Sequence, residues 1–265
     1  ALGGNSLSAM KLAAKLSAVF GIDVPIRILF ASTTVASLAE RIGLARRVGF
    51  DSNMDEAIRV MLPIRKATGS PVFCVHPIIG LAWSYSSLSP YIDDASPIYG
   101  LQTPVLTDES PIPTSLESYI ERYVTEIRAV QPEGPYRLLG WSLGGVLAQG
   151  FAARLEADGD DVARLILLDC LPEPLDGDGA TFADHLRGEL ASIGIAVDAS
   201  ESMTGLSEEA AEALLDAVDG DRVGLTAGRL QRLFESYAVM GELVESYRPR
   251  PSAGDALLIR SNDVK

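Results

Sequence analysis

The stretch that decides the fold is Tyr136–Gly145, which reads YRLLGWSLGG. Its first residues form a mostly apolar run typical of a buried strand, and a helical pattern with one apolar stripe continues from its end to Leu155. Between the two lies Gly140-Trp141-Ser142-Leu143-Gly144, a match to G-x-S-x-G. A strand, a tight turn and a helix are the setting in which such a serine is exposed for nucleophilic attack, whereas the alternative is a serine that only caps the helix. We predict that Ser142 is a catalytic nucleophile.

The residues around Ser142 suit this chemistry. Gly140 and Gly144, two positions before and after the serine, relieve crowding between the strand and the helix in a strained turn. The backbone N–H of Leu143 then points at a developing oxyanion, helped by the positive end of the helix. We therefore assign Leu143 to an oxyanion hole.

Short apolar runs alternate with helical patterns over the middle of the chain, which predicts an α/β fold with a parallel sheet covered on both faces. The expected strands are 71–76, 97–101, 136–140, 165–168 and 256–260, and the expected helices between the first four are 115–130 and 143–155. Only helical patterns fill the region between the last two strands, at about 181–191, 207–218 and 226–247. A helical insertion between two strands of one sheet predicts a lid, at about 172–250.

An acid for the same site follows the strand expected at 165–168. Asp169 comes directly after this run and lies C-terminal to Ser142. The carboxyl ends of parallel strands form the sites of open α/β sheets, and in this architecture the acid follows the serine along the chain. We predict that Asp169 orients a catalytic histidine, the alternative being an ordinary aspartate in the loop after a strand.

The histidine is the missing member of this predicted triad. The chain holds two, His76 and His185. His76 precedes both Ser142 and Asp169 and is expected to shape the turn after an apolar strand, while His185 is expected on a solvated face of a lid helix. Because the base follows the acid along the chain in this architecture, we expect the catalytic histidine beyond Lys265.

The N-terminal part of the chain differs from the rest. Residues 1–47 read as helices only, and residues 48–60 read as a polar linker. The first helix is expected to begin near Ser6 and to stop at Gly21, and a second runs from about residue 34 to 46.

A second notable serine opens the first of these helices, in Gly3-Gly4-Asn5-Ser6-Leu7. Taken alone, Ser6 reads as an ordinary helix N-cap. A helix start also favours a phosphate on the serine, because free N–H groups and the helix dipole attract an anion. Both interpretations of Ser6 stay open on this pattern.

Composition narrows the function classes. The 265 residues are 47% hydrophobic, enough for a sizeable core, and the net charge is −14. Such an acidic chain lacks the basic surface of a protein that binds nucleic acid or an anionic membrane. Cys74 and Cys170, both in apolar runs, are expected to be buried thiols. With neither a membrane span nor a signal peptide in view, we expect a soluble cytoplasmic protein, and the pattern predicts no metal site.

Together, the two serine motifs resemble those of a known family. Leu2–Leu7 is similar to the attachment motif of peptidyl carrier domains in nonribosomal peptide synthetases, with Asn5 where aspartate or histidine is usual. Gly140–Gly145, together with Phe73–Pro77 (FCVHP) and Leu167–Asp169, resembles their terminal type I thioesterase. The resemblance covers nearly the whole chain and is to a carrier–thioesterase didomain of a termination module.

The resemblance implies a domain organisation. A partial carrier domain, a small all-α helical bundle, would span 1–47, with its first helix before Ala1. A thioesterase domain of the α/β-hydrolase type with a helical lid would span 61–265, and its C-terminal part would lie beyond the chain.

The resemblance also implies an activity. Ser6 would carry 4′-phosphopantetheine, Ser142 would take the peptide from the thioester as an acyl-enzyme, and the N–H groups of Leu143 and Ile78 would hold the oxyanion. Release would follow by hydrolysis or macrocyclisation, in siderophore or antibiotic biosynthesis. The implied partners are a phosphopantetheinyl transferase, the upstream condensation and adenylation domains of the same synthetase, and the peptidyl thioester substrate. Two alternatives are a stand-alone esterase or lipase of the same fold and a non-catalytic carrier-docking module.

Overall fold

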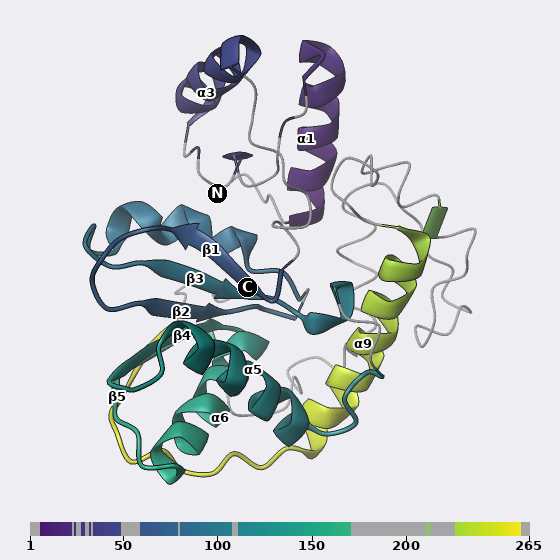
Figure 1. Ribbon diagram of the computed structural model, residues 1–265. Coiled ribbons are helices and arrows are strands. Elements are labelled where there is room, and N and C mark those ends of the chain that lie inside the picture. The colour runs from purple at the N-terminus through teal and green to yellow at the C-terminus, as the bar shows by residue number, and fades with distance from the viewer. Residues whose placement is uncertain are drawn as a thin grey trace.

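A six-stranded sheet forms the centre of the molecule (Figure 1). The computed structural model describes residues 6–22, 24, 28–29, 32, 34–48, 59–78, 80–107, 111–170, 211–212 and 226–260. The strand order is β1-β3-β2-β4-β5-β6, with bounds Met61–Arg65 (β1), Val72–Val75 (β2), Ile98–Leu101 (β3), Tyr136–Trp141 (β4), Val162–Leu168 (β5) and Ala256–Ile259 (β6). All neighbours are parallel except β1, which is antiparallel to β3. The five strands predicted from the sequence are all present.

Helices cover one face of this sheet and a 3₁₀ segment covers part of the other. The helices α5 (Leu116–Val130) and α6 (Leu143–Ala157) pack on one face, and η1 (Trp83–Tyr91) lies on the opposite side (Figure 1). All four residues of β2 are buried, because this strand lies inside the sheet and is covered on both faces. The predicted α/β architecture is confirmed.

Some elements were not predicted from the sequence, namely β1, η1 and the short η2 (Pro104–Leu106). The strand β1 contains Pro63, which cannot donate a ladder hydrogen bond. Its place at the edge of the sheet tolerates the proline, and its antiparallel direction departs from the parallel expectation.

Of the lid region predicted at 172–250, the structure describes the last helix. This helix, α9 (Ala227–Ser246), begins at the N-cap Thr226, whose side chain accepts a hydrogen bond from the N–H of Arg229. It lies beside η2 and α5 (Figure 1). Six of its residues are buried: Leu230, Leu233, Phe234, Ser236, Tyr237 and Met240. The helix predicted at 181–191 lies outside the described residues, and of the one at 207–218 only residues 211 and 212 are described, both helical.

Two helices of the N-terminal region are where the sequence places them. They are α1 (Ser6–Phe20) and α3 (Val35–Val48). Gly21 follows α1 with a φ of 64°, and its N–H donates to the carbonyl of Ser17 at 2.9 Å, a typical helix end. The Ser17 hydroxyl then accepts from the N–H of Val24, also at 2.9 Å, which fixes the chain after the turn. Most of the expected linker, residues 49–58, lies outside the described part of the chain.

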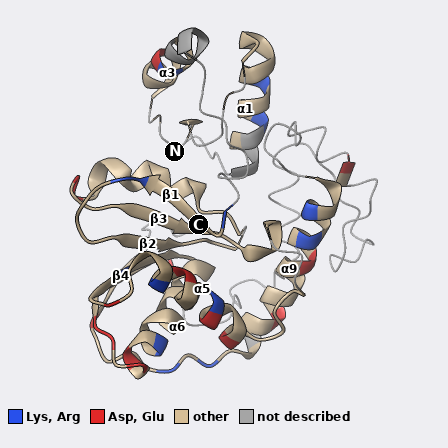
Figure 2. Cartoon of the chain, viewed as in Figure 1, with Lys and Arg blue, Asp and Glu red and all other residues tan. Residues whose placement is uncertain are grey.

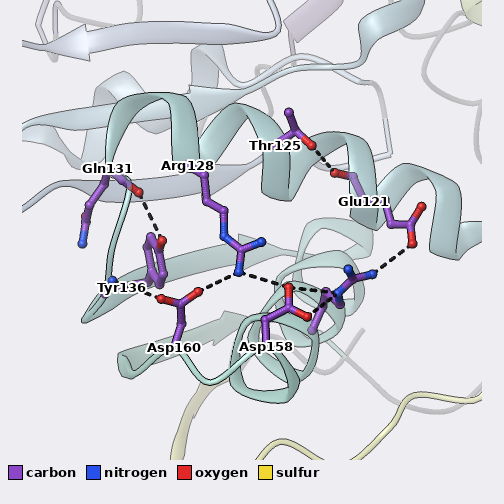
Figure 3. Close-up of polar contacts among 9 residues, drawn as sticks. Glu121, Thr125, Arg128, Gln131, Tyr136, Asp158 and Asp160 are labelled. Atoms are coloured by element: carbon purple, nitrogen blue, oxygen red, sulfur yellow. Dashed lines mark hydrogen bonds and ion pairs between the residues drawn. The ribbon is translucent and has the colours of Figure 1, made fainter.

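Charged side chains of both signs lie on the helices that flank the sheet. Figure 2 shows both signs on α5, α6 and α9, while β2 carries none. One ion-pair network joins α5 to the loop before β5: the Arg128 guanidinium contacts Asp160 at 2.7 Å and Asp158 at 3.0 Å (Figure 3). The hydroxyl of Tyr136, the first residue of β4, donates to the carbonyl of Gln131 at 3.1 Å beside them. This network fastens the amino ends of β4 and β5, which lie at the opposite edge of the sheet from their carboxyl ends.

No helix among the described residues is long and apolar enough to cross a membrane.

Candidate active site

Ser142 lies in a strained turn between β4 and α6. Its φ of 54° and ψ of −124° fall in a region that residues with a side chain rarely occupy. Two backbone hydrogen bonds hold it there: its N–H donates to the carbonyl of Leu168 at 2.9 Å, and its own carbonyl accepts from Gly145 at 2.9 Å. The side chain is half-buried at the start of the helix. This is the strand–turn–helix geometry that exposes a serine nucleophile.

The two glycines of the motif and the next residue, Gly145, are each required by a close approach. A Cβ on Gly140 would lie 2.0 Å from the carbonyl oxygen of Gly144. A Cβ on Gly144 would lie 2.2 Å from the carbonyl oxygen of Val75, at the end of β2. A Cβ on Gly145 would lie 2.6 Å from Sγ of Cys170. The glycines therefore let the turn, the end of β2 and the end of β5 meet around Ser142.

Asp169 is the residue directly after β5, beside the serine turn. Trp141 pairs with Leu168 at the ends of the neighbouring parallel strands β4 and β5. Ser142 and Asp169 are the residues that directly follow this pair. Asp169 also has a positive φ, 43°, and its N–H donates to the carbonyl of Ile259 in β6 at 2.8 Å. Its side chain is exposed. Ser142 and Asp169 thus share the carboxyl edge of the sheet, the place that the sequence predicts for them.

The turn after β2 lies against Thr103 and the helix α9. Gly80 donates from its N–H to the carbonyl of Pro77 at 2.9 Å and has a φ of 77°. Its carbonyl accepts from the N–H of Thr103 at 2.7 Å, and a Cβ on Gly80 would meet both Thr103 and Leu233 of α9. Within this turn Ile78 is half-buried and packs on the main core cluster. The helix α9 and the predicted oxyanion turn are therefore in direct contact.

His76 is fully engaged beneath this turn. Its ring Nδ1 lies 2.7 Å from the carbonyl oxygen of Pro77, and Nε2 lies 2.6 Å from the hydroxyl of Tyr123. A carbonyl can only accept, so Nδ1 carries the proton and Nε2 accepts from the tyrosine. Burial lowers the pKa of His76 to about 4, and its side chain is buried among core residues. The prediction that His76 shapes the turn agrees with this bonding.

The contact between the Tyr123 hydroxyl and His76 was not predicted. Tyr123 lies on α5 at a spacing that reads as core, and nothing in the sequence distinguishes its hydroxyl. His76 is the one histidine within the described ranges, and His185 lies outside them. Among the described residues, no group of three or more His, Cys, Asp or Glu side chains is arranged to hold a metal ion. Cys74 and Cys170 are both free and buried, as predicted.

Ser6 is the first residue of α1, so its backbone lies at a helix start. The residues before it lie outside the described part of the chain. The fifteen-residue helix that follows supplies the free N–H groups and the positive dipole end that suit a phosphate.

Comparison with known families decides what this arrangement is. A family model described as thioesterase domain matches residues 70–254, which contain the Ser142 turn and Asp169. The chain belongs to the thioesterase domain family. A second model, phosphopantetheine attachment site, matches residues 1–42, which contain Ser6. This thioesterase domain therefore follows a segment that matches the phosphopantetheine attachment-site model.

Individual relatives agree with this placement. Enterobactin synthase component F of Escherichia coli K12 is 43% identical over 176 residues, 65% of this chain and 13% of that protein. The dimodular nonribosomal peptide synthase of Bacillus subtilis is 34% identical over 271 residues, 99% of this chain and 11% of that protein. The chain thus spans only a small part of the curated relatives that it matches.

Solved structures place the fold among the α/β-hydrolase thioesterases. The NocB thioesterase domain, captured as a covalent complex with a fluorophosphonate nocardicin G analog, is 27% identical with a TM-score of 0.54, and 72% of each chain is covered. A four-domain nonribosomal peptide synthetase, holo-AB3403, superposes on 99% of this chain and 20% of its own, with a TM-score of 0.64 and 24% identity. The predicted hydrolase fold after a small carrier region is confirmed.

Proposed function

We propose that this protein releases a finished peptide from a carrier domain in nonribosomal peptide synthesis, through an acyl-enzyme on Ser142. The observation that carries the proposal is the strained Ser142 turn, tied through Leu168 to the strand end that presents Asp169. The presence of a carrier-type segment in the same chain supports a carrier-bound thioester as the substrate.

Ser142 acts as the nucleophile. Its hydroxyl attacks the thioester carbonyl, a histidine takes the proton, and the tetrahedral intermediate collapses to an ester on Ser142 as the thiol leaves with that proton. Water or a nucleophile within the peptide then attacks this ester and frees Ser142. Hydrolysis gives an acid and internal attack gives a ring.

The oxyanion is held by backbone N–H groups of Leu143 and Ile78. Leu143 is the first residue of α6, so its N–H belongs to the free set at a helix start. The turn that contains Ile78 follows His76, and the carbonyl oxygens of Val75 and His76 lie against Gly144. Donors fixed in place before the reaction stabilise developing charge without reorganising, and this is their main contribution to rate.

Asp169 orients the catalytic histidine and stabilises its cation. His76 is unsuited to that role because both of its ring nitrogens are bonded and its pKa is lowered to about 4. The base is therefore a different histidine, and the expectation that it follows Lys265 stays a proposal.

Ser6 is the attachment site in this proposal, and its place at the start of α1 fits a phosphodiester. When bound there, 4′-phosphopantetheine supplies the thiol that carries the acyl group. The chain's own contribution at that end is a hydroxyl on a helix N-terminus, which a phosphopantetheinyl transferase would modify.

The proposed partners, domain limits and cellular compartment follow from the same assignment of Ser6 and Ser142. Upstream condensation and adenylation domains would build and load the peptide, and the region at 172–250 would shape the pocket above Ser142. The domain limits 1–47, 48–60 and 61–265 belong to this proposal too. Two free buried cysteines suit work in the reducing cytoplasm.

The test uses the full-length native protein, loaded with peptide. In Ser142→Ala, product release should fall by roughly 10⁵- to 10⁶-fold, because the nucleophile and its base act as a unit. Intact-protein mass spectrometry should find the peptide stalled on Ser6, and Ser6→Ala should accept no phosphopantetheine. A serine-directed fluorophosphonate should label the wild type and leave Ser142→Ala unlabelled. A protein that gains no phosphopantetheine would be a stand-alone esterase, and one that takes no fluorophosphonate would be a docking module.

A further inference from the structure

A buried tyrosine joins the two strand ends that meet at the active site. Tyr85, on η1, is 2% exposed. Its hydroxyl donates to the carbonyl oxygen of Val75 at 2.6 Å and accepts from the N–H of Trp141 at 2.9 Å. Val75 is the last residue of β2, and Trp141 is the last residue of β4. One phenol oxygen therefore bridges two neighbouring strands where both leave the sheet.

The bridge stands at the end of the β2–β4 ladder. The last residues paired there are Val75 and Gly140. The backbone groups next to that pair, the Val75 carbonyl and the Trp141 N–H, are the two that the Tyr85 hydroxyl contacts. The hydroxyl has one proton to donate and uses it on a carbonyl, while its lone pair takes the N–H. The hydroxyl thus uses both its donor and its acceptor in a buried place, where leaving either one unpaired would cost free energy.

The residues that follow each bonded group are those of the proposed chemistry. Ser142 follows Trp141, and the turn with Ile78 begins just after Val75 and His76. The same Val75 carbonyl oxygen would lie 2.2 Å from a Cβ on Gly144, so it is already pressed against the start of α6. A shift of either strand end would change the separation between the serine hydroxyl and the oxyanion donors.

We propose that Tyr85 is a positioning residue that sets the spacing between the nucleophile turn and the oxyanion turn. This inference rests on the proposed function of Ser142. Tyr85 acts through Val75 and Trp141 and does not itself touch the substrate. Burial raises the pKa of Tyr85 well above 10, so the hydroxyl keeps its proton and stays a donor at neutral pH. Displacements of under an ångström cost rate in preorganised sites, because the donors must meet the oxyanion at about 2.7–3.1 Å.

The experiment measures labelling of Ser142 by a fluorophosphonate in the full-length protein. Tyr85→Phe removes one oxygen and keeps the ring, so core packing is preserved. We expect the second-order labelling rate and kcat for peptide release to fall roughly 10- to 100-fold, with KM unchanged. The matched control is Tyr91→Phe, a change in the same segment at a side chain that is 82% exposed. It should label at the wild-type rate.

A second variant separates positioning from folding. Replacing Tyr85 with 4-aminophenylalanine keeps a donor toward the Val75 carbonyl at the same place, while its conjugated nitrogen is a weaker acceptor, and it should restore part of the labelling rate. Wild-type labelling in Tyr85→Phe would overturn the inference, as would a loss that matches the fraction of unfolded protein in urea titration or that the amino variant fails to rescue. Absence of labelling in the wild type, or labelling that persists in Ser142→Ala, would instead overturn the proposed function.

Discussion

The N–H of Ser142 donates a 2.9 Å hydrogen bond to the carbonyl oxygen of Leu168, the residue that precedes Asp169. The nucleophile turn is therefore fastened to the strand end that carries the acid. Asp169 is in turn fastened to β6 through its own N–H, which donates to Ile259 at 2.8 Å. Because both positions have a positive φ, each is held by its neighbours against a backbone cost of about 1–3 kcal/mol. The sheet supplies the geometry of the site through main-chain bonds.

Asp169→Asn should slow release without unfolding the protein. The amide keeps the shape of the side chain, and the anchoring bond to Ile259 comes from the backbone. The change removes the charge that stabilises the histidine cation, so kcat should fall roughly 10³- to 10⁴-fold, less than in Ser142→Ala. The measurement is single-turnover release of a loaded peptide at pH 7. Wild-type release would assign the acid to another residue.

Gly144→Ala should damage both stability and activity. Its new Cβ would lie 2.2 Å from the Val75 carbonyl oxygen and 2.7 Å from that of His76, and neither backbone group can move aside freely. We expect a loss of roughly 2–4 kcal/mol in unfolding free energy, from overpacking at fixed backbone, and loss of fluorophosphonate labelling.

The control for this change is Gly228→Ala. Gly228 lies in the first turn of α9, and its Cβ would meet no atom within 4 Å. Alanine there should leave labelling unchanged and raise stability by a few tenths to about 1 kcal/mol, since it is the better helix former. Urea titration of both variants makes the comparison, and equal stabilities would contradict the close-approach argument.

The local structure around Ser142 and Asp169 is predictable from the sequence alone. The stretch Tyr136–Gly145 was predicted as a strand, a turn and a helix, and the structure has β4, the strained Ser142 and α6 there. Such local patterns are reliable because the strand period, the helix period and the glycines all concern neighbouring residues. Asp169 was placed by the same logic, since it ends an apolar run at the carboxyl edge of the sheet.

Contacts between distant residues were not predictable in this way. Tyr85 reaches Trp141 across 56 positions, and Tyr123 reaches His76 across 47. A tyrosine at a core spacing has the same sequence signature whether its hydroxyl is used or not. The strand β1 was missed for another reason: Pro63 weakens the strand pattern, and only its place at the edge of the sheet makes it acceptable.

The hydrogen bond between Tyr119 of α5 and Ser236 of α9 should stabilise the packing of α9. Their hydroxyl oxygens are 3.0 Å apart and both residues are buried. Ser236→Ala should cost roughly 1–2 kcal/mol because it leaves the Tyr119 hydroxyl unsatisfied. A double-mutant cycle with Tyr119→Phe should return a coupling energy of about 1 kcal/mol, measured by urea unfolding. Additive losses would mean that the two hydroxyls do not act on one another.

His76 should make the protein less stable in mild acid. Burial lowers its pKa from 6.5 to about 4 in the folded state, so between these values the unfolded chain binds more protons than the folded one. Stability should therefore be complete above about pH 6.5 and should fall as the pH drops toward 4. The difference between the two pKa values corresponds to roughly 3 kcal/mol. Tyr123, the side chain bonded to Nε2, has a pKa raised well above 10 and does not titrate in this range.

The pH dependence of His76→Gln provides the test. Urea unfolding at pH 7, 6 and 5 should give a shallower loss of stability for the variant than for the wild type, because the variant has no imidazole to protonate. The comparison uses the two slopes, so a uniform destabilisation of His76→Gln does not affect it. Fluorophosphonate labelling of His76→Gln at pH 7 should be slower but present, since the side chain supports the oxyanion turn and is not the base. Identical slopes would show that His76 is protonated as readily in the folded protein as in the unfolded chain. Complete loss of Ser142 labelling in a folded variant would make His76 the base after all.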